Sequence, residues 1–118
     1  MYSVHGELLS ILENPYLLLL ALSRAPKEGW SVASAVADVA KGLRQDSAIP
    51  FSTAYTAIRT LQINGWVHVV RKDASGPGRP KILYGLTDNG RLKVKDVLDL
   101  LRRTSEYANA APTTRDRP

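Results

Sequence analysis

Residues 65–90 read GWVHVVRKDASGPGRPKILYGLTDNG, and this stretch decides the fold. The segment 66–70 is rich in valine with an aromatic residue, which is typical of a strand, and 82–86 predicts a strand that returns. Between them, residues 76–80 hold two glycines and two prolines. We therefore expect irregular structure over 71–80 and a β-hairpin with a long basic tip.

Helices are expected on both sides of this hairpin. Four precede it, at about residues 6–13, 15–23, 31–40 and 52–64. Asn14 and Ser52 are the expected N-caps of the second and fourth helices, with Pro15 in the first turn that follows Asn14. Ser31 opens the third helix. Gly65 is a helix stop, for which we expect the left-handed backbone conformation.

A loop over residues 41–50 separates the third and fourth helices, and Thr87 caps a long last helix that we expect to fray near 107–111. The order of four helices, hairpin and long helix predicts a mainly α fold with a small β-wing, the winged helix-turn-helix plan. We divide the chain into a DNA-binding domain (1–86), a C-terminal dimerisation helix (87–111) and a disordered tail (112–118).

The composition limits the classes of protein that this chain could represent. Its 118 residues are 44% hydrophobic, which is enough for one core, and contain no cysteine. The absence of cysteine excludes disulfide scaffolds, thiolate zinc sites, iron–sulfur clusters and a cysteine nucleophile. No stretch has the roughly 20 apolar residues of a membrane helix. No basic segment precedes an apolar one, so we expect a cytoplasmic protein without a signal peptide or a membrane partner.

Apolar stripes mark the faces that helices bury. In the third helix, a single stripe holds Val32, Val36, Val39 and Leu43. The second helix is apolar on nearly every face, which suits either a core helix or a dimer surface. The last helix carries a stripe wider than one small domain must cover. Its members are Leu92, Val94, Val97, Leu98, Leu100 and Leu101.

The fourth helix has a polar face that could contact DNA. This face holds Ser52, Thr53, Tyr55, Thr56, Arg59 and Thr60. Short hydroxyls allow a helix to approach a duplex closely, and an arginine can bind guanine through two hydrogen bonds. The alternative is an ordinary polar face. For Tyr55 taken alone, burial against the core is the favoured prediction.

Part of the net charge of +5 falls on the expected hairpin, which carries Arg71, Lys72, Arg79 and Lys81. Cations on a hairpin can bind phosphates or enter a minor groove. The alternative is a solvated turn. No catalytic set is visible, because His5 and His68 lie far apart and neither has carboxylates at ligand spacing. We therefore expect no catalytic residue, metal site or cofactor, and a function other than that of an enzyme.

Several of these residues resemble the PadR family of transcriptional regulators. The stretch Gly78-Arg79-Pro80-Lys81, with Tyr84, Leu86-Thr87 and Gly90 after it, is similar to that family's wing and the helix start that follows. In the expected recognition helix, Thr53, Tyr55, Leu61 and Gly65 are similar to its Thr-x-Tyr and Leu-x-x-x-Gly. The resemblance covers roughly residues 9–105. The loop 41–50 is longer than usual, and the recognition helix has fewer arginines.

The resemblance implies a homodimeric regulator of transcription, commonly a repressor, that binds double-stranded DNA. It also implies a dimer in which the last helix packs on the partner's N-terminal helix, and a small apolar or aromatic effector between the dimer helices. The expected dimer residues are Leu8, Leu9, Leu12, Leu92, Val94, Val97, Leu98 and Leu101. A winged-helix module that binds protein without sequence-specific DNA binding remains the main alternative, and an RNA-binding winged domain a further one.

Overall fold

A computed structural model describes residues 13–43 and 49–110 of the chain. The helix expected at 6–13, except for Glu13, and the expected tail at 112–118 lie outside the described residues. So do three residues of the predicted dimer interface, Leu8, Leu9 and Leu12.

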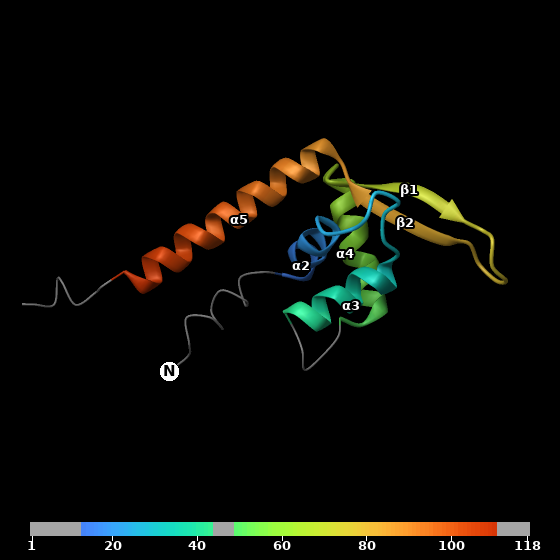
Figure 1. Ribbon diagram of the computed structural model, residues 1–118, viewed down its shortest axis with the longest axis horizontal. Coiled ribbons are helices and arrows are strands. Elements are labelled where there is room, and N and C mark those ends of the chain that lie inside the picture. The colour runs from blue at the N-terminus through green and yellow to red at the C-terminus, as the bar shows by residue number, and fades with distance from the viewer. Residues whose placement is uncertain (1–12, 44–48, 111–118) are drawn as a thin grey trace, which may run out of the picture.

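Three helices form the body of the molecule: α2 (Asn14–Leu22), α3 (Val32–Gly42) and α4 (Phe51–Ile63). A hairpin of β1 (Val67–Asp73) and β2 (Lys81–Leu86) follows, and then the long helix α5 (Asp88–Asn109). Figure 1 shows the three helices packed together, with the hairpin and α5 pointing away on opposite sides. The predicted order of helices, hairpin and long helix is confirmed for the described residues.

Two of the predicted helix starts are wrong by one or two residues. Glu13, not Asn14, is the N-cap of α2, and no side chain caps that end. Helix α4 begins at Phe51 behind Pro50, so Ser52 lies inside its first turn. The fixed φ of a proline suits the start of a helix, and Pro50, with φ −57°, occupies the N-cap.

Three other predicted boundary residues are confirmed. The Ser31 side chain accepts a hydrogen bond from the backbone N–H of Ser34 at the start of α3. Gly65 has a φ of +78°, the left-handed conformation that ends α4. The Thr87 side chain accepts from the backbone N–H of Gly90 at 2.9 Å and so caps α5.

The core lies where α2, α3 and α4 meet. Leu18 and Leu19 of α2 are fully buried there, as the core alternative for this helix requires, and Ile58 and Leu61 of α4 pack with them. The predicted stripe of α3 is confirmed except at its end. Leu43 follows the last helical residue and remains 42% exposed.

The hairpin is longer than predicted. The expectation that regular structure stops at Arg71 is wrong, because β1 continues to Asp73 and Asp73 pairs with Lys81. The glycines and prolines that suggested a break all come after this point. The register shifts between Val69 and Arg71, which leaves Val70 as a bulge.

Both tryptophans join the hairpin to the core. Trp30 forms a bridge to Tyr84, with its N–H 2.9 Å from the Tyr84 carbonyl and its carbonyl 2.8 Å from the Tyr84 N–H. Trp66 is partly buried against the core and lies 6.2 Å from the Tyr16 ring. Lys93 of α5 lies over both rings, 5.0 Å from that of Trp66.

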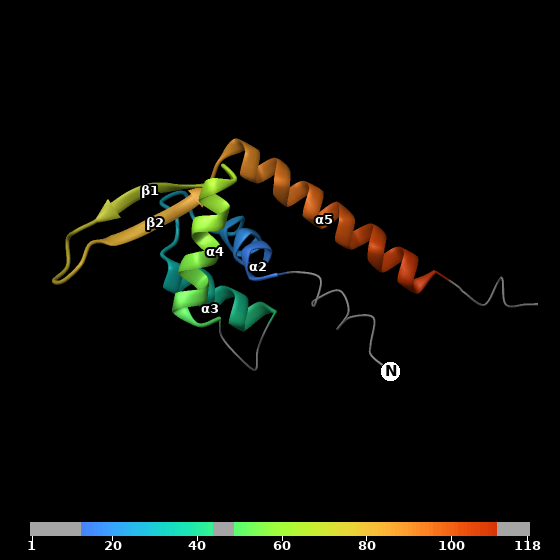
Figure 2. The ribbon, with the colours of Figure 1, turned by 180° about the vertical axis from the view of Figure 1, so that it is seen from behind.

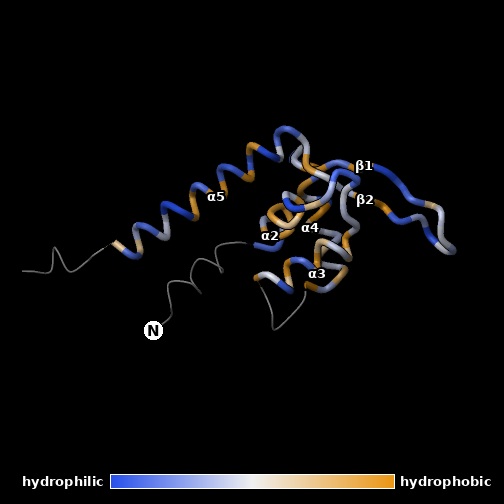
Figure 3. Tube along the Cα trace, in the orientation of Figure 1, coloured by the Kyte–Doolittle hydropathy of each residue, from blue (hydrophilic) through white to orange (hydrophobic). Residues whose placement is uncertain are grey.

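Helix α5 extends away from the body, as Figures 1 and 2 show from opposite sides. Apolar residues recur along it between polar ones, which Figure 3 shows as alternating orange and blue. Val94 and Val97 are buried within the chain, whereas Leu92, Leu98 and Leu100 are exposed. Among the described residues, no helix is long and apolar enough to cross a membrane.

Candidate nucleic-acid interface

The outer face of α4 gathers four of the nine residues predicted to contact DNA. Ala54, Ala57, Ile58 and Leu61 turn inward and are buried. Their burial fixes the rotation of the helix, so that Ser52, Tyr55, Thr56 and Arg59 are exposed together.

Tyr55 corrects one expectation, since its predicted burial is wrong: the residue is 58% exposed. It lies on the flank of α4 that faces the hairpin. There it adds to burial, the larger effect, in raising the pKa of Tyr84 above its ordinary value. Tyr84 is itself buried at this junction, and Tyr55 remains outside it.

The hydroxyls of Thr56 and Thr60 in α4 are already engaged in hydrogen bonds. Thr56 Oγ1 donates to the backbone carbonyl of Ser52 at 3.1 Å, and Thr60 Oγ1 donates to that of Thr56 at 3.2 Å. Each hydroxyl has only one proton to donate. In this conformation both threonines can offer a ligand their methyl groups and an acceptor oxygen, but no donor.

Two apolar side chains on α4 were missed by the sequence reasoning. Phe51 is 57% exposed at the first residue of the helix, and Ile63 is 77% exposed at the last. The signal for Phe51 was its spacing of four residues from Tyr55, which places both on one side of a helix. That signal was hidden because the helix was expected to begin at Ser52.

Thr53 lies at the edge of this face and is half-buried. It borders an open groove of about 470 Å³ between α4 and the start of α2. The groove is lined by Glu13, Asn14, Pro15, Ser52, Thr53, Thr56, Ala57 and Thr60. Thr53 is therefore less available to a ligand of the outer face than Thr56 is.

The hairpin carries the four predicted cations, and all of them are exposed. Arg71 lies 3.6 Å from Asp73 in an ion pair, while no ion pair involves Lys72, Arg79 or Lys81 within the described part of the chain. The turn after β1 is ordered by Asp73, which accepts from the Ser75 hydroxyl at 2.6 Å and from its N–H at 3.0 Å. These bonds, that of the hydroxyl above all, hold the pKa of Asp73 below its ordinary value.

Helix α4 and the hairpin base lie side by side in both views (Figures 1 and 2). Asn64, Gly65 and Trp66 form the short connection, in which the backbone N–H of Trp66 donates to the Leu61 carbonyl at 3.0 Å. The exposed face of α4 and the cations of the hairpin therefore belong to adjoining elements held by a tight turn. His68, exposed on β1, has no cluster of metal-ligating groups around it among the described residues.

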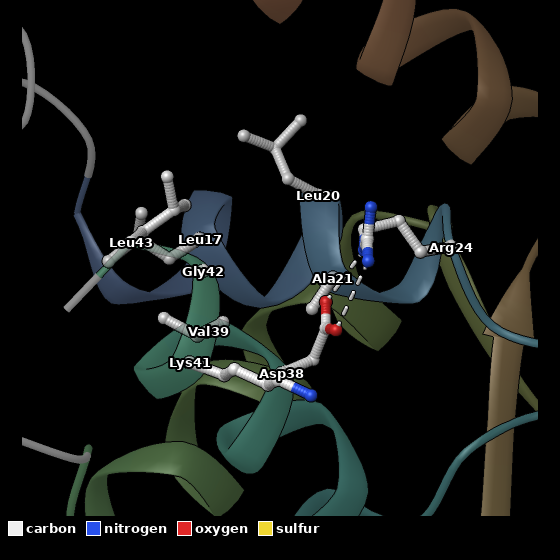
Figure 4. A pocket seen from close by; sticks show the side chains of 9 residues that line it. All are labelled: Leu17, Leu20, Ala21, Arg24, Asp38, Val39, Lys41, Gly42 and Leu43. Carbon is white, nitrogen blue, oxygen red and sulfur yellow. Dashed lines mark hydrogen bonds and ion pairs between the residues drawn. The ribbon is translucent and has the colours of Figure 1, made fainter. Parts of the chain in front are cut away.

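A second surface is apolar and lies between α2 and α3. Leu17, Leu20 and Leu43 border an open groove of about 500 Å³, seen in Figure 4. Arg24 and Asp38 form an ion pair at 2.9 Å beside it.

Comparison with solved structures identifies the arrangement of these elements. No protein-family model matches the sequence, and neither does any curated protein. The fold is similar to that of Bacillus subtilis PadR in a crystal structure with operator DNA, with a TM-score of 0.57 and 24% sequence identity. The chain has a winged-helix fold.

That match covers 70% of this winged helix and 46% of the PadR chain, so the present chain spans about half the length of that protein. A transcriptional regulator of the MarR family from Silicibacter pomeroyi is also similar, with a TM-score of 0.54 and 19% identity. This match covers 95% of this winged helix and 69% of the MarR-family chain. The predicted fold class is thereby confirmed, with the β1–β2 hairpin as the wing of the winged-helix plan.

Proposed function

We propose that this winged helix is a cytoplasmic, homodimeric regulator of transcription that binds specific double-stranded DNA sequences, and that it represses in the manner of PadR. The observation that supports this most is the exposed face of α4 beside a wing with four exposed cations. A protein surface of this shape and charge fits the major groove and the flanking phosphates.

In this proposal, the N-terminal half of α4 enters the major groove. Arg59 is the one cation on its outer face and would bind guanine or a phosphate. Arg71, Lys72, Arg79 and Lys81 would hold the wing against the phosphate backbone or in the minor groove. Arg79 and Lys81 flank Pro80, where the turn of the wing joins β2.

The dimer of this proposal is built through α5. Leu98 and Leu100 are 51% and 53% exposed. Contact with a second copy would remove these apolar side chains from water. Leu101 is half-buried beside them, and Leu92 is exposed nearer the start of the helix. The α2–α3 groove offers an apolar surface for the α5 of the partner. Two α4 helices would then face DNA about one helical turn apart.

The proposal includes an effector only as the PadR resemblance implies it. A small apolar or aromatic molecule that binds between the dimer helices would change the distance between the two α4 helices. Release from DNA would follow from that change in distance, since both helices must fit successive major grooves.

Selection from a library of random-sequence duplexes tests the proposal. The full chain is bound to the library, bound duplexes are recovered, and the cycle is repeated. We expect enrichment of one inverted-repeat sequence. Recovery without any enriched sequence would contradict it and would favour the alternative, a winged-helix module that binds protein.

A further inference from the structure

The exposed face of α4 is apolar at the end that a major groove would receive. Phe51 and Tyr55 lie one turn apart on the same side and are 57% and 58% exposed. Together the two side chains form an exposed apolar patch, which suits contact with a partner surface better than a single exposed side chain does. The four cations of the adjoining wing indicate that the partner which covers this patch is a polyanion.

The hydrogen bond that the Thr56 hydroxyl donates also favours apolar contact with DNA. Its hydroxyl proton is donated to the Ser52 carbonyl, so that this side chain presents a methyl group and an acceptor. Arg59 is then the one charged donor on the outer face of α4. Ser52 and Tyr55 add one hydroxyl donor each, and the Phe51 ring, the Tyr55 ring and the Thr56 methyl are the groups of this face that can contact an apolar part of a base.

Thymine is the base that carries an apolar group in the major groove, its 5-methyl. We infer that Phe51, Tyr55 and Thr56 recognise thymine methyl groups, and that each operator half-site is thymine-rich where the N-terminal half of α4 binds. This inference rests on the proposed function and names the base chemistry that the function uses. Arg59 adds a contact to a guanine or a phosphate at the edge of this thymine-rich segment.

The test compares two duplexes of the selected sequence, one with thymine and one with deoxyuridine at every thymine position. Deoxyuridine removes the methyl group and keeps the base-pairing edge. Burial of one methyl group corresponds to about a fourfold change in affinity. We expect the uridine duplex to bind at least about tenfold more weakly, as measured by fluorescence anisotropy at one salt concentration.

Variants assign the effect to named side chains. Phe51→Ala should bind the thymine duplex more weakly and reduce the thymine-to-uridine ratio of affinities. Ile63→Ala is the matched control, because Ile63 is an exposed apolar residue of the same helix about 18 Å farther along its axis. That variant should keep the ratio of the unmodified chain. Both positions are exposed, and a thermal melt checks that each variant is folded.

Thr56 separates methyl contact from hydrogen bonding. Thr56→Val keeps a methyl group and removes the hydroxyl, and it should preserve the thymine-to-uridine ratio. Thr56→Ser keeps the hydroxyl and removes the methyl, and it should lower the ratio about fourfold for each subunit, and so about 15-fold for the dimer. The reverse order of these two variants would overturn the inference.

The outcomes distinguish this inference from the function on which it rests. Selection without enrichment overturns both. An enriched sequence that binds equally well as thymine and as uridine duplex overturns the inference and leaves the proposed function standing. A thymine preference that survives Phe51→Ala and Thr56→Ser overturns the assignment to these side chains.

Discussion

Gly90, in the first turn of α5, lies directly against the backbone of Trp66, at the start of the wing. A Cβ atom at Gly90 would collide with the carbonyl group of Trp66. Thr87 secures the same junction: its N–H donates to the Trp66 carbonyl at 3.0 Å, and its hydroxyl donates to the Gly65 carbonyl at 2.6 Å. The spacing of Thr87 and Gly90 therefore sets how α5 leaves the body.

Gly90→Ala should destabilise the chain, because the new methyl group forces α5 away from Trp66. We expect a loss of about 1–3 kcal/mol in the free energy of unfolding, the usual cost of overpacking. Chemical denaturation followed by circular dichroism measures it. Gly76→Ala is the control, since a Cβ at Gly76 meets no neighbour within 4 Å. Equal stabilities of the two variants would refute the role assigned to this close approach.

Arg79→Ala should weaken binding to every DNA sequence by a similar factor, since Arg79 is assigned to the phosphate backbone. The slope of log affinity against log salt should fall by about 1 for each phosphate that the variant no longer neutralises, and so by about 2 in a dimer. Anisotropy titrations over a range of salt concentrations give this slope. Lys95→Ala, at an exposed site on α5, should leave it unchanged. If both variants behave alike, the wing does not bind DNA.

Leu98→Glu should dissociate the dimer, because it places a charge on the exposed apolar stripe of α5. Removing one buried leucine from each of two copies raises the dimer dissociation constant by at least about 100-fold. Sedimentation velocity over a range of concentrations measures the constant. Lys95→Glu changes the charge of the same helix away from the stripe and should remain dimeric. A dimer that survives Leu98→Glu would place the interface elsewhere.

Ser75→Ala should raise the pKa of Asp73 toward 3.8, its ordinary value, because the hydroxyl bond is the main cause of the lowered pKa. The deprotonated carboxylate accepts this bond, so the order of the turn is present above the pKa of Asp73 and is lost as pH falls through it. An NMR titration of the carboxyl carbon measures the change. Ser75→Thr keeps the hydroxyl and should keep the lowered pKa. An unchanged pKa in Ser75→Ala would disprove this account of the turn.

The elements that short local patterns determine were predicted well. Gly65 and Thr87 act through their own backbone geometry or through bonds to near neighbours, so sequence spacing was enough to place them. The buried stripe of α3 followed from its apolar period, except for Leu43 at its end. The motif around Gly90 was noticed as a resemblance, but its physical reason, the close approach to Trp66, needed the folded chain.

The remainder depended on tertiary contacts that sequence spacing does not contain. Pairing with Lys81 keeps Asp73 in β1, although no strand propensity suggested it. Tyr55 was expected in the core, but Tyr84 of β2 is buried at the junction of hairpin and body, and Tyr55 lies outside it. Phe51 was overlooked because Pro50 starts the helix earlier than a serine N-cap predicts.

The most direct test of the central claim is a fluorescence-anisotropy titration of the full chain with two duplexes at two salt concentrations. One duplex carries the selected sequence, and the other carries the same bases in scrambled order. The account predicts preference for the selected duplex by about 1,000-fold or more, with both affinities falling steeply as salt rises. Equal affinity for the two duplexes at both salt concentrations would contradict it.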